Sequence, residues 1–357
     1  MARNSKKNNA YVSHGGRITI AALAQSLGLT KGTVSRALSG YPDISPNTKQ
    51  RVREAARKLG YQPSASATAI KSGKTRSALF VMNSGWDEAH PAGVVNMGDG
   101  ISRELLSAGC MLCVNSVRHD DDLEQVSKVL LAGKRVDGLI IPRPAQMDAR
   151  VSIAQDSGLP FLTFGRPPRT NNPYIDVDVE ACVSCSMAKL VAHGHHEIAF
   201  VGSCADQEDS DLWLTAFRCL LKKNGLAERL EHILCGASDM ESVKSFATGL
   251  LTSNSPPTAF LCSRDLAAVA VISAAKECGL AVGRQVSVVG FGGDPLCEEV
   301  APQLASFKVD FQQIGQEIAA QFLRCLEPGR EPAPTTLYEA KYIRGSTVGQ
   351  LSVQNSS

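Results

Sequence analysis

Residues 20–39, IAALAQSLGLTKGTVSRALS, predict two short helices joined by a tight turn. Four apolar residues of the first helix recur at the i, i+3, i+4 and i+7 spacing that places them on one face: Ile20, Leu23, Ala24 and Leu27. Gly28 supplies the left-handed residue that ends this helix, and Thr30 can cap the next helix through its side-chain oxygen. The stretch therefore predicts a helix-turn-helix.

The second helix of this motif has a small, polar and basic outward face. Its inward residues are Val34, Ala37 and Leu38, and its outward residues are Lys31, Gly32, Ser35 and Arg36. Such a face suits a recognition helix in the major groove of DNA, where short residues allow close approach and long cations reach guanine edges or phosphates. A helical hairpin with a merely solvated polar face would show the same pattern, so the motif alone does not decide between the two.

The distribution of charge favours DNA. The 357-residue chain has a net charge of only +2, but residues 1–76 contain fourteen Lys and Arg against Asp43 and Glu54, a net charge of +12. The remaining residues consequently have a net charge of −10. A basic head on an acidic body is typical of a protein that meets a polyanion at one end only.

Three further features surround the helix-turn-helix. Residues 1–17 are polar, basic and without apolar periodicity, which predicts a disordered arm that adds phosphate contacts. Residues 45–60 predict a third helix, with Ser45 as its cap and a proline in its first turn. In the linker that follows, PSASATAIKSGKT, Ile70 is the one bulky apolar residue. Two interpretations remain: a flexible tether, or a helix that orders on DNA and wedges Ile70 into the minor groove.

From residue 77 onward, short apolar runs alternate with amphipathic stretches. The predicted strands are 78–82, 111–115, 138–141, 160–164, 198–201, 258–262 and 286–290. Between them run amphipathic stretches that predict helices, such as 122–131, 180–191, 212–222, 266–276 and 312–323. This alternation indicates parallel sheets covered on both faces by helices. Since about 265 residues exceed one comfortable core, we expect two similar α/β lobes, with a small-molecule cleft at the carboxyl ends of their strands.

The composition argues against several other classes of protein. No stretch approaches the roughly 18 apolar residues of a membrane span, and the N-terminal MARNSKKNNA lacks the apolar segment of a signal peptide, so we expect a cytoplasmic protein without membrane contact. A transport binding protein would need such a signal peptide and no basic head. No nucleophile elbow, Walker loop or G-x-G-x-x-G follows the first predicted strand, so we expect neither catalytic residues nor a cofactor.

The eleven cysteines are an odd number, and in a reducing compartment they are expected to be small buried hydrophobes. Two pairs have zinc-like spacing, Cys110/Cys113 and Cys182/Cys185, and three histidines follow the second pair: His193, His195 and His196. The first pair fits alternating strand residues and the second fits one helix face. We therefore expect no metal site.

Several motifs in a fixed order resemble the LacI/GalR family of bacterial transcription regulators, from residue 18 to about 349. They are ITIAALAQSLGLTKGTVSRALSG, LGYQPSASATAIKSGKT, VDGLIIPRP, LPFLTFGRP followed by IDVD, LCSRDLAAVAVISAAKECGL, and VSVVGFGGDPL. The resemblance implies an all-α DNA-binding head, a periplasmic-binding-protein-like α/β core of two Rossmann-like lobes, a homodimer and a palindromic operator. No leucine heptads follow Gly349 to support a tetramer.

On this resemblance the chain divides into a disordered arm (1–17), a helix-turn-helix domain (18–62), a hinge (63–76), a two-lobed effector-binding and dimerisation core (77–349) and a tail (350–357). The N-lobe is expected to comprise about 77–176 plus 307–338, and the C-lobe about 177–306 plus 339–349.

The resemblance also implies site residues. The expected DNA contacts are Thr19, Thr30, Lys31, Gly32, Thr33, Ser35, Arg36 and Ile70, and the expected effector contacts are Arg143, Arg166, Trp213, Asp265 and Phe311. For Asp265, capping the helix that begins near Leu266 is the alternative role.

Several positions depart from the family pattern. Gly32 has no side chain with which to discriminate operators, Ile70 replaces the usual leucine, and Thr68 stands where many relatives have arginine. Trp213 replaces an arginine that in many relatives binds a sugar. Gly292-Gly293-Asp294 replaces the usual pair of aspartates after GF, which leaves the identity of the effector open.

We therefore expect a cytoplasmic, nucleoid-associated, homodimeric repressor of carbohydrate-utilisation genes that releases its operator when a sugar-like effector closes the cleft. A regulator that needs a co-repressor, a regulator that responds to a different class of effector, and a small-molecule-binding protein without a regulatory role are the alternatives.

Overall fold

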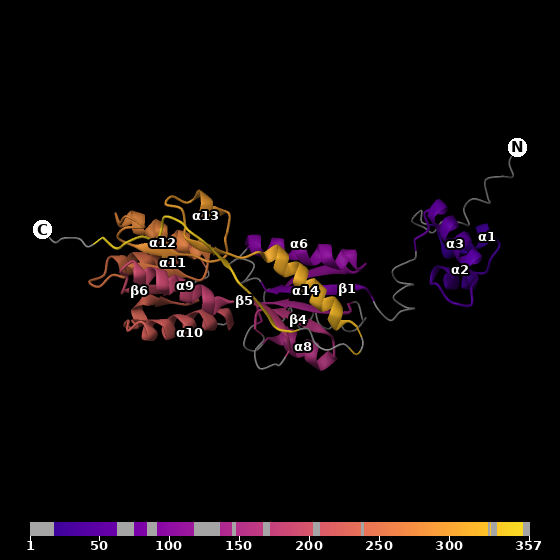
Figure 1. Cartoon of the computed structure of the whole chain (residues 1–357), viewed down its shortest axis with the longest axis horizontal. Helices are drawn as coiled ribbons and strands as arrows, with labels where there is room; N and C mark the ends of the chain where they lie inside the picture. Colours follow the sequence, from indigo (N-terminus) through magenta and orange to yellow (C-terminus); the bar gives the residue numbers. More distant parts are fainter. Residues whose placement is uncertain are drawn as a thin grey trace. The chain divides into compact units, whose positions relative to one another are not determined.

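The computed structural model describes residues 18–62, 75–83, 91–117, 136–144, 148–166, 172–202, 208–236, 239–327, 329 and 334–352. The chain forms two compact units, Met1–Thr75 and Arg76–Ser357, which are called the head and the core unit below (Figure 1). The arm 1–17, most of the hinge with Ile70, and the predicted helix 122–131 lie outside the described residues.

The head is a three-helix domain. Its helices are α1 (Ile20–Leu27), α2 (Lys31–Leu38) and α3 (Pro46–Leu59). Each begins with a hydroxyl cap, because Thr19, Thr30 and Ser45 accept hydrogen bonds from backbone N–H groups in the first turns of their helices. Gly28 and Gly60, both in the left-handed region, end α1 and α3. The predicted helix-turn-helix and third helix are thus confirmed.

The first sheet of the core unit is entirely parallel, with strand order β11-β5-β4-β3-β1-β2. Its strands are β1 (Ser77–Asn83), β2 (Met111–Val117), β3 (Gly138–Pro142), β4 (Phe161–Phe164), β5 (Tyr174–Val177) and β11 (Thr336–Tyr338). Alternate strand residues face opposite layers. Phe80 packs toward α6 (Pro91–Ser107) and α14 (Phe311–Cys325), whereas Leu79 packs toward α8 (Ala149–Ser157). Figure 1 shows α6 and α8 on opposite sides of the strands. Helices therefore cover both faces, as the apolar strands predict.

Helices α6 and α14 pack with their backbones in contact. A Cβ on Gly100 of α6 would meet the carbonyl oxygen of Gln312, and a Cβ on Gly315 of α14 would meet that of Met97. Glycine is required at both positions because no side chain fits between the helices.

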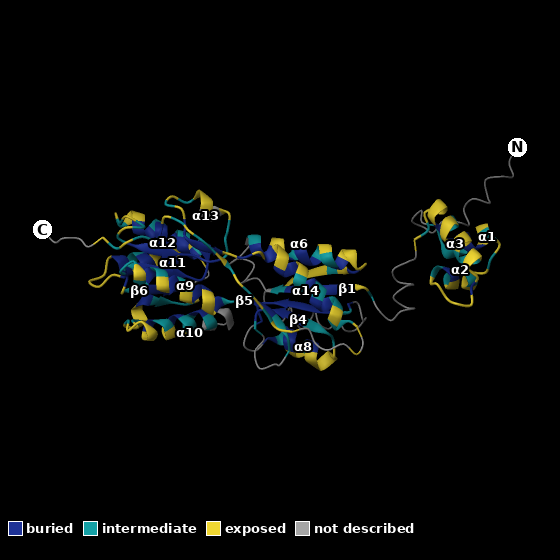
Figure 2. Cartoon of the chain, viewed as in Figure 1, coloured by how far each residue is buried: buried dark blue, intermediate teal, exposed yellow. Residues whose placement is uncertain are grey.

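The second parallel sheet has the order β7-β6-β8-β9, from β6 (Ile198–Val201), β7 (Ile233–Leu234), β8 (Ala259–Cys262) and β9 (Ser287–Val289). Helices α9 (Val179–Ala192) and α10 (Glu208–Lys223) cover one face, and α11 (Met240–Leu251) and α12 (Asp265–Glu277) cover the other. The short helix α13 (Leu296–Glu299) follows β9. Figure 2 shows the strands of both sheets as the buried layer beneath partly exposed helices.

An antiparallel pair, β10 (Ser306–Lys308) and β12 (Lys341–Ile343), accompanies the crossing of the chain between the two sheets. Strand β10 leads from the second sheet into α14 of the first, and β12 follows β11. Within the described part of the chain, no helix is long and apolar enough to cross a membrane.

Candidate functional site

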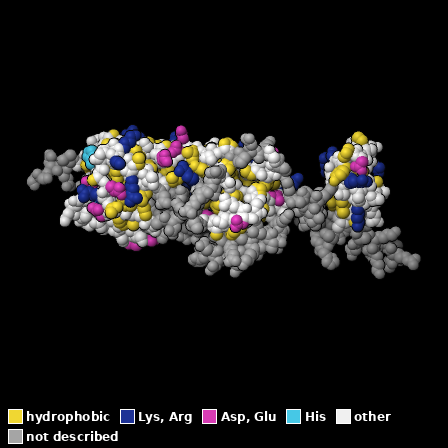
Figure 3. Space-filling model, turned by 90° about the horizontal axis from the view of Figure 1, so that it is seen from below, with side chains coloured by type: hydrophobic (Ala, Val, Ile, Leu, Met, Phe, Trp, Pro, Cys, Tyr) yellow, Lys and Arg dark blue, Asp and Glu magenta, His cyan; other side chains and the backbone are white. Residues whose placement is uncertain are grey.

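Helix α2 presents its polar face at the surface of the head. Lys31, Gly32 and Arg36 are exposed, and Val34 is fully buried against the other helices. Figure 3 shows Lys and Arg side chains gathered over the head. This exposed, basic helix has the properties that a major-groove reader requires.

Two of the three threonines expected at the DNA surface, Thr19 and Thr30, are helix caps. The side-chain oxygen of Thr19 accepts from the backbone N–H of Ala22 at 3.2 Å, and that of Thr30 accepts from Thr33 at 3.1 Å. The Oγ1 atoms of Thr30 and Thr33 also lie 2.9 Å apart. Gly32 has open space around it, since the nearest heavy atom to a Cβ would be Thr30 Oγ1 at 3.8 Å. Packing therefore does not require glycine there, and its effect is to expose the backbone of α2.

Arg36 has an acidic partner within the head. Its Nη1 atom lies 2.8 Å from Asp43 Oδ2, and the two side chains are 51% and 48% exposed. An ion pair this accessible is weak, because water screens both charges. The guanidinium can exchange Asp43 for a phosphate or a guanine edge at little cost.

In the core unit, Arg143 and Arg166 follow the carboxyl ends of β3 and β4, as expected from the sequence. The Arg143 guanidinium lies 3.2 Å from Asp176 Oδ1 on β5 and 4.7 Å from the centre of the Phe164 ring. The Arg166 Nε atom donates to the Tyr174 hydroxyl at 3.0 Å. Burial disfavours the charge on Arg166, but the bond to Tyr174 and the field of Asp176 raise its pKa overall, so it stays cationic.

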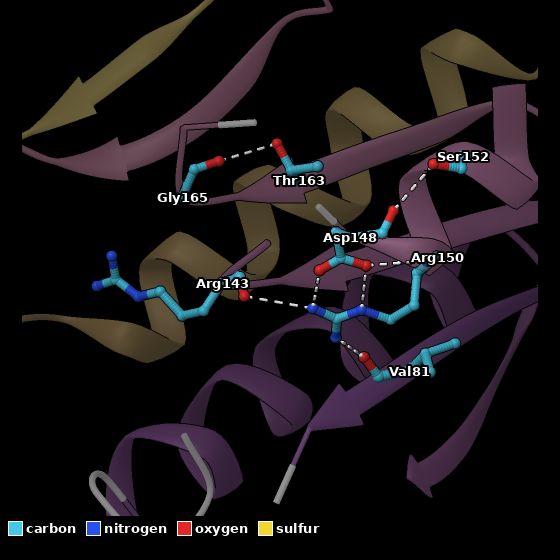
Figure 4. A network of polar contacts seen from close by, with 7 residues as sticks. All are labelled: Val81, Arg143, Asp148, Arg150, Ser152, Thr163 and Gly165. Carbon is cyan, nitrogen blue, oxygen red and sulfur yellow. Dashed lines mark hydrogen bonds and ion pairs between the residues drawn. The ribbon is translucent and has the colours of Figure 1, made fainter. Parts of the chain in front are cut away.

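Sequence reasoning did not identify the ion pair beneath Arg143. Asp148 and Arg150, at the start of α8, have side chains that are 4% and 2% exposed and form a bidentate pair (Figure 4). Charged residues are ordinarily expected at the surface, and nothing in the sequence except the D-x-R spacing indicated that these two are buried.

Asp265 is a buried junction in the second lobe. Its Oδ2 accepts from the backbone N–H of Asp294 at 2.8 Å, and its Oδ1 accepts from the Ser306 hydroxyl at 2.5 Å. The N-cap of α12 is Arg264, which makes no side-chain capping bond, and Asp265 is the first helical residue. The carboxylate therefore joins the loop after β9 to β10, and the N-cap position of the helix belongs to the preceding residue.

Trp213 is 3% exposed and packs edge-on against Phe291, with ring centres 4.9 Å apart. A tryptophan at this position can stack on a ligand or fill the protein interior, and this geometry matches the second role.

A polar cavity of about 160 Å³ lies where α6, the loop after β9 and the β10–α14 crossing meet. Its lining includes Asn96, Asp265, Asp294, Lys308 and Phe311, together with Gly292 and Gly293. Of the expected effector residues, the structure brings Asp265 and Phe311 together here. Arg143, Arg166 and Trp213 are not among the lining residues.

Among the described residues, no three His, Cys, Asp or Glu side chains are grouped closely enough to hold a metal ion. Burial raises the pKa of the Cys182 thiol to about 12, an effect increased by Asp178, so this cysteine is a protonated hydrophobe at neutral pH.

Two family models match the chain. One is described as bacterial regulatory proteins, lacI family, over residues 19–64, and the other as a periplasmic binding protein-like domain, over residues 187–348. The HTH-type transcriptional regulator RafR of Escherichia coli is 30% identical over 285 residues, which cover 78% of this chain and 82% of that protein. The chain belongs to the LacI family. As a LacI-family protein it is a DNA-binding transcriptional regulator and not an enzyme.

Solved structures agree with this family fold. The lac repressor dimer bound to operator and the anti-inducer ONPF has a TM-score of 0.81 at 24% identity, covering 94% of this chain and 100% of that chain. The complex of the regulator CelR with cellobiose has a TM-score of 0.71 at 22% identity, covering 93% of this chain and 100% of that chain. The LacI-type head and the periplasmic-binding-protein-like core with parallel sheets are thus confirmed.

Proposed function

We propose that this LacI-family regulator is a repressor of carbohydrate-utilisation genes, located in the cytoplasm and associated with the nucleoid. It binds a pseudo-palindromic operator as a homodimer and releases it when a sugar or sugar derivative occupies the core unit. The main support is that one chain combines the exposed basic helix α2 with a polar cavity in a periplasmic-binding-protein-like core.

On the DNA side, α2 enters the major groove. Lys31 and Arg36 contact guanine edges or phosphates, Thr19, Thr30, Thr33 and Ser35 approach the backbone, and Gly32 allows close approach. In the hinge, Ile70 wedges into the minor groove and kinks the operator. The net charge of +12 on residues 1–76 supplies the salt-dependent part of the affinity.

On the effector side, the cavity supplies both hydrogen-bond acceptors and donors. An ionised carboxylate can accept about four hydrogen bonds, so Asp265 can accept from ligand hydroxyls beside Asp294 and Ser306. Asn96 and Lys308 can donate to sugar oxygens, and Phe311 offers a ring to the apolar face of a sugar. Outside the lining of this cavity, Arg143 and Arg166 add guanidinium donors from the carboxyl ends of β3 and β4. Trp213 acts indirectly, by packing against Phe291, the residue before Gly292.

The surface of the first lobe supports a homodimer. Four large apolar side chains are strongly exposed on α6 and on the edge strand β2: Val95 (71%), Leu106 (60%), Met111 (62%) and Val114 (56%). An exposed apolar edge strand is a liability for a monomer and a natural contact for a second copy. Two copies would supply the two heads that a palindrome requires.

Release of the operator then follows from a shift in the populations of the open and closed states of the core unit. An effector that binds the closed lobes more tightly shifts the dimer to that state, the hinges lose their mutual packing and the kinked complex dissociates. A co-repressor would have the opposite effect, because its binding would raise operator affinity.

The test is to select bound sequences from random DNA and then to screen raffinose, cellobiose, glucose and glucuronate for release. We expect a two-fold symmetric site and release by at least one sugar. An asymmetric site would contradict the dimer, and tighter binding with sugar would identify a co-repressor. Arg36→Ala should strongly weaken selection, whereas Arg218→Ala, which removes an exposed cation from α10, is the matched control.

A further inference from the structure

We infer that Arg150 is a positioning residue for the effector, because it holds Arg143 in the conformation that presents the Arg143 guanidinium. The inference rests on the proposed contact between Arg143 and the effector. Arg150 lies on α8, and it reaches the carboxyl ends of β1 and β3 from beneath the sheet (Figure 4).

The donors of Arg150 are distributed among three parts of the lobe. Nε and Nη2 donate to the two carboxylate oxygens of Asp148 at 3.0 and 2.7 Å. Nη1 donates to the carbonyl of Val81 on β1 at 2.8 Å, and Nη2 also donates to the carbonyl of Arg143 at 3.2 Å. The bidentate pair fixes the plane of the guanidinium, and the fixed plane aims the remaining donors at the two carbonyls.

Arg143 needs such a partner because its backbone is unusual. Its φ of 43° lies in the left-handed region, which a bulky side chain rarely adopts. Its backbone N–H donates to the carbonyl of Phe164 at 2.6 Å, and its carbonyl accepts from Arg150. Both backbone polar groups of Arg143 are therefore hydrogen-bonded. Strained backbone of this kind persists only where its surroundings hold it, and it concentrates at ligand sites.

The left-handed backbone determines where the Arg143 side chain goes. From this position the guanidinium lies over the Phe164 ring and beside Asp176, with its side chain only 5% exposed. Figure 4 shows the side chain extending away from the Asp148–Arg150 pair. A donor that is held in place before binding loses less conformational entropy when the ligand binds. Removing the hold of Arg150 on Arg143 should therefore lower effector affinity more than it lowers the stability of the fold.

Arg150→Lys is the informative variant. A lysine keeps the charge beside Asp148 but cannot make the bidentate bond and reach both carbonyls at once. Arg229→Lys is the matched control, since Arg229 forms a similar bidentate pair with Glu197 outside the site. For the sugar from the panel that releases operator, we expect the half-release concentration of Arg150→Lys to rise about tenfold. Operator affinity without sugar should be unchanged, and Arg229→Lys should behave like the parent protein.

A double-mutant cycle separates positioning from a purely structural role. If Arg150 acts through Arg143, then Arg150→Lys has no further effect on release in an Arg143→Ala background. Two outcomes would overturn the inference and leave the proposed function standing. One is that the effects of Arg150→Lys and Arg143→Ala on release add in the double variant, and the other is that Arg150→Lys responds normally to sugar while Arg143→Ala does not. A normal response of Arg143→Ala would overturn the proposed contact of Arg143, and the inference with it.

Hydrogen exchange provides a test that needs no sugar. In Arg150→Lys the backbone amide of Arg143 should exchange at least tenfold faster, while peptides of the second sheet stay unchanged. An unchanged rate at Arg143 would overturn the inference, whichever sugar the protein answers to. If no sugar in the panel causes release, the proposed function fails on that count, and the exchange rate still decides whether Arg150 holds Arg143.

Discussion

The head and the core unit each contain an ion pair between an arginine and an aspartate, and the two pairs differ in how far they are buried. Arg36 and Asp43 meet at 2.8 Å, and Arg150 and Asp148 meet at 2.7 Å. In the head, both side chains are about half exposed, whereas in the core unit they are 2% and 4% exposed. Distance alone therefore says little about what an ion pair does.

The difference in burial separates two uses of charge. An exposed guanidinium is held weakly and can change partners, which suits a helix that must find a polyanion. A buried guanidinium has no alternative partner, so it fixes the backbone around it and is costly to disturb. In the function proposed above, the exposed charge of the head meets DNA and the buried charge of the core unit shapes the effector site.

The largest expected effect is the response of the two units to salt. Raising salt from about 50 to 200 mM should weaken operator binding by roughly a thousandfold or more, because counterions compete with exposed cations for phosphates. Effector affinity should change by less than about threefold, since buried donors are poorly screened. Operator titrations and calorimetry over the same salt series measure both. Equal salt dependence of the two would remove the distinction.

The second effect concerns stability. Asp148→Ala should lower the free energy of unfolding by about 3 to 5 kcal/mol, because it leaves the Arg150 charge buried without its carboxylate. Asp43→Ala should cost no more than about 1 kcal/mol, since it opens an exposed pair. Urea unfolding measures both changes. Similar costs for the two variants would show that burial does not distinguish the pairs.

A third and smaller effect is expected at the cavity. Asp265→Ala should weaken the effector by about ten- to a hundredfold, the value of a charge-assisted hydrogen bond, while operator affinity stays unchanged. Asp265→Asn is the control, because it preserves the shape and keeps an acceptor. Unchanged effector affinity in the alanine variant would confine Asp265 to joining Asp294 and Ser306, and lost operator binding would show that the head depends on it.

The smallest expected effect is a difference in acid sensitivity. His195 is fully buried, with Nε2 3.2 Å from the Gly349 carbonyl and Nδ1 3.1 Å from the Thr258 hydroxyl, and burial lowers its pKa below the ordinary 6.5. The unfolded chain therefore binds the proton more readily. The stabilisation from neutral His195 is complete above about pH 6.5 and is lost as the pH falls through the lowered pKa.

Residues 18–62 of the head contain no histidine, so only the core unit should show this loss. Calorimetric melting between pH 7.5 and 5.5 should show a core transition that falls with acid in the parent protein and falls less in His195→Gln. The same slope in both proteins would assign the acid sensitivity to other groups.

The sequence predicts best where one physical signal dominates. The predicted strand 198–201 coincides with β6, because four consecutive apolar residues are buried on both faces. Helices α6, α8 and α11 were not among the predicted stretches, and in α8 the first turn buries Arg150, which does not fit an amphipathic pattern. Strand β5 was missed because Asp176 lies inside it, buried beside Arg143. The charge of Asp176 is compensated by Arg143, 33 residues away, and that of Arg150 by its near neighbour Asp148, and hydrophobic periodicity shows neither pairing.

The glycines after β9 also bear on how the effector specificity of this protein can change over evolution. Gly293 has a φ of 73°, and a Cβ there would lie 2.7 Å from the Cα of Lys308. Restoring an aspartate typical of the LacI/GalR family at this position would thus strain the backbone and push against β10 at once. An aspartate at residue 293 would therefore need compensating changes in β10 before it became tolerable. Residue 293 and β10 can therefore change only together, which limits the side chains that this loop can present to a ligand.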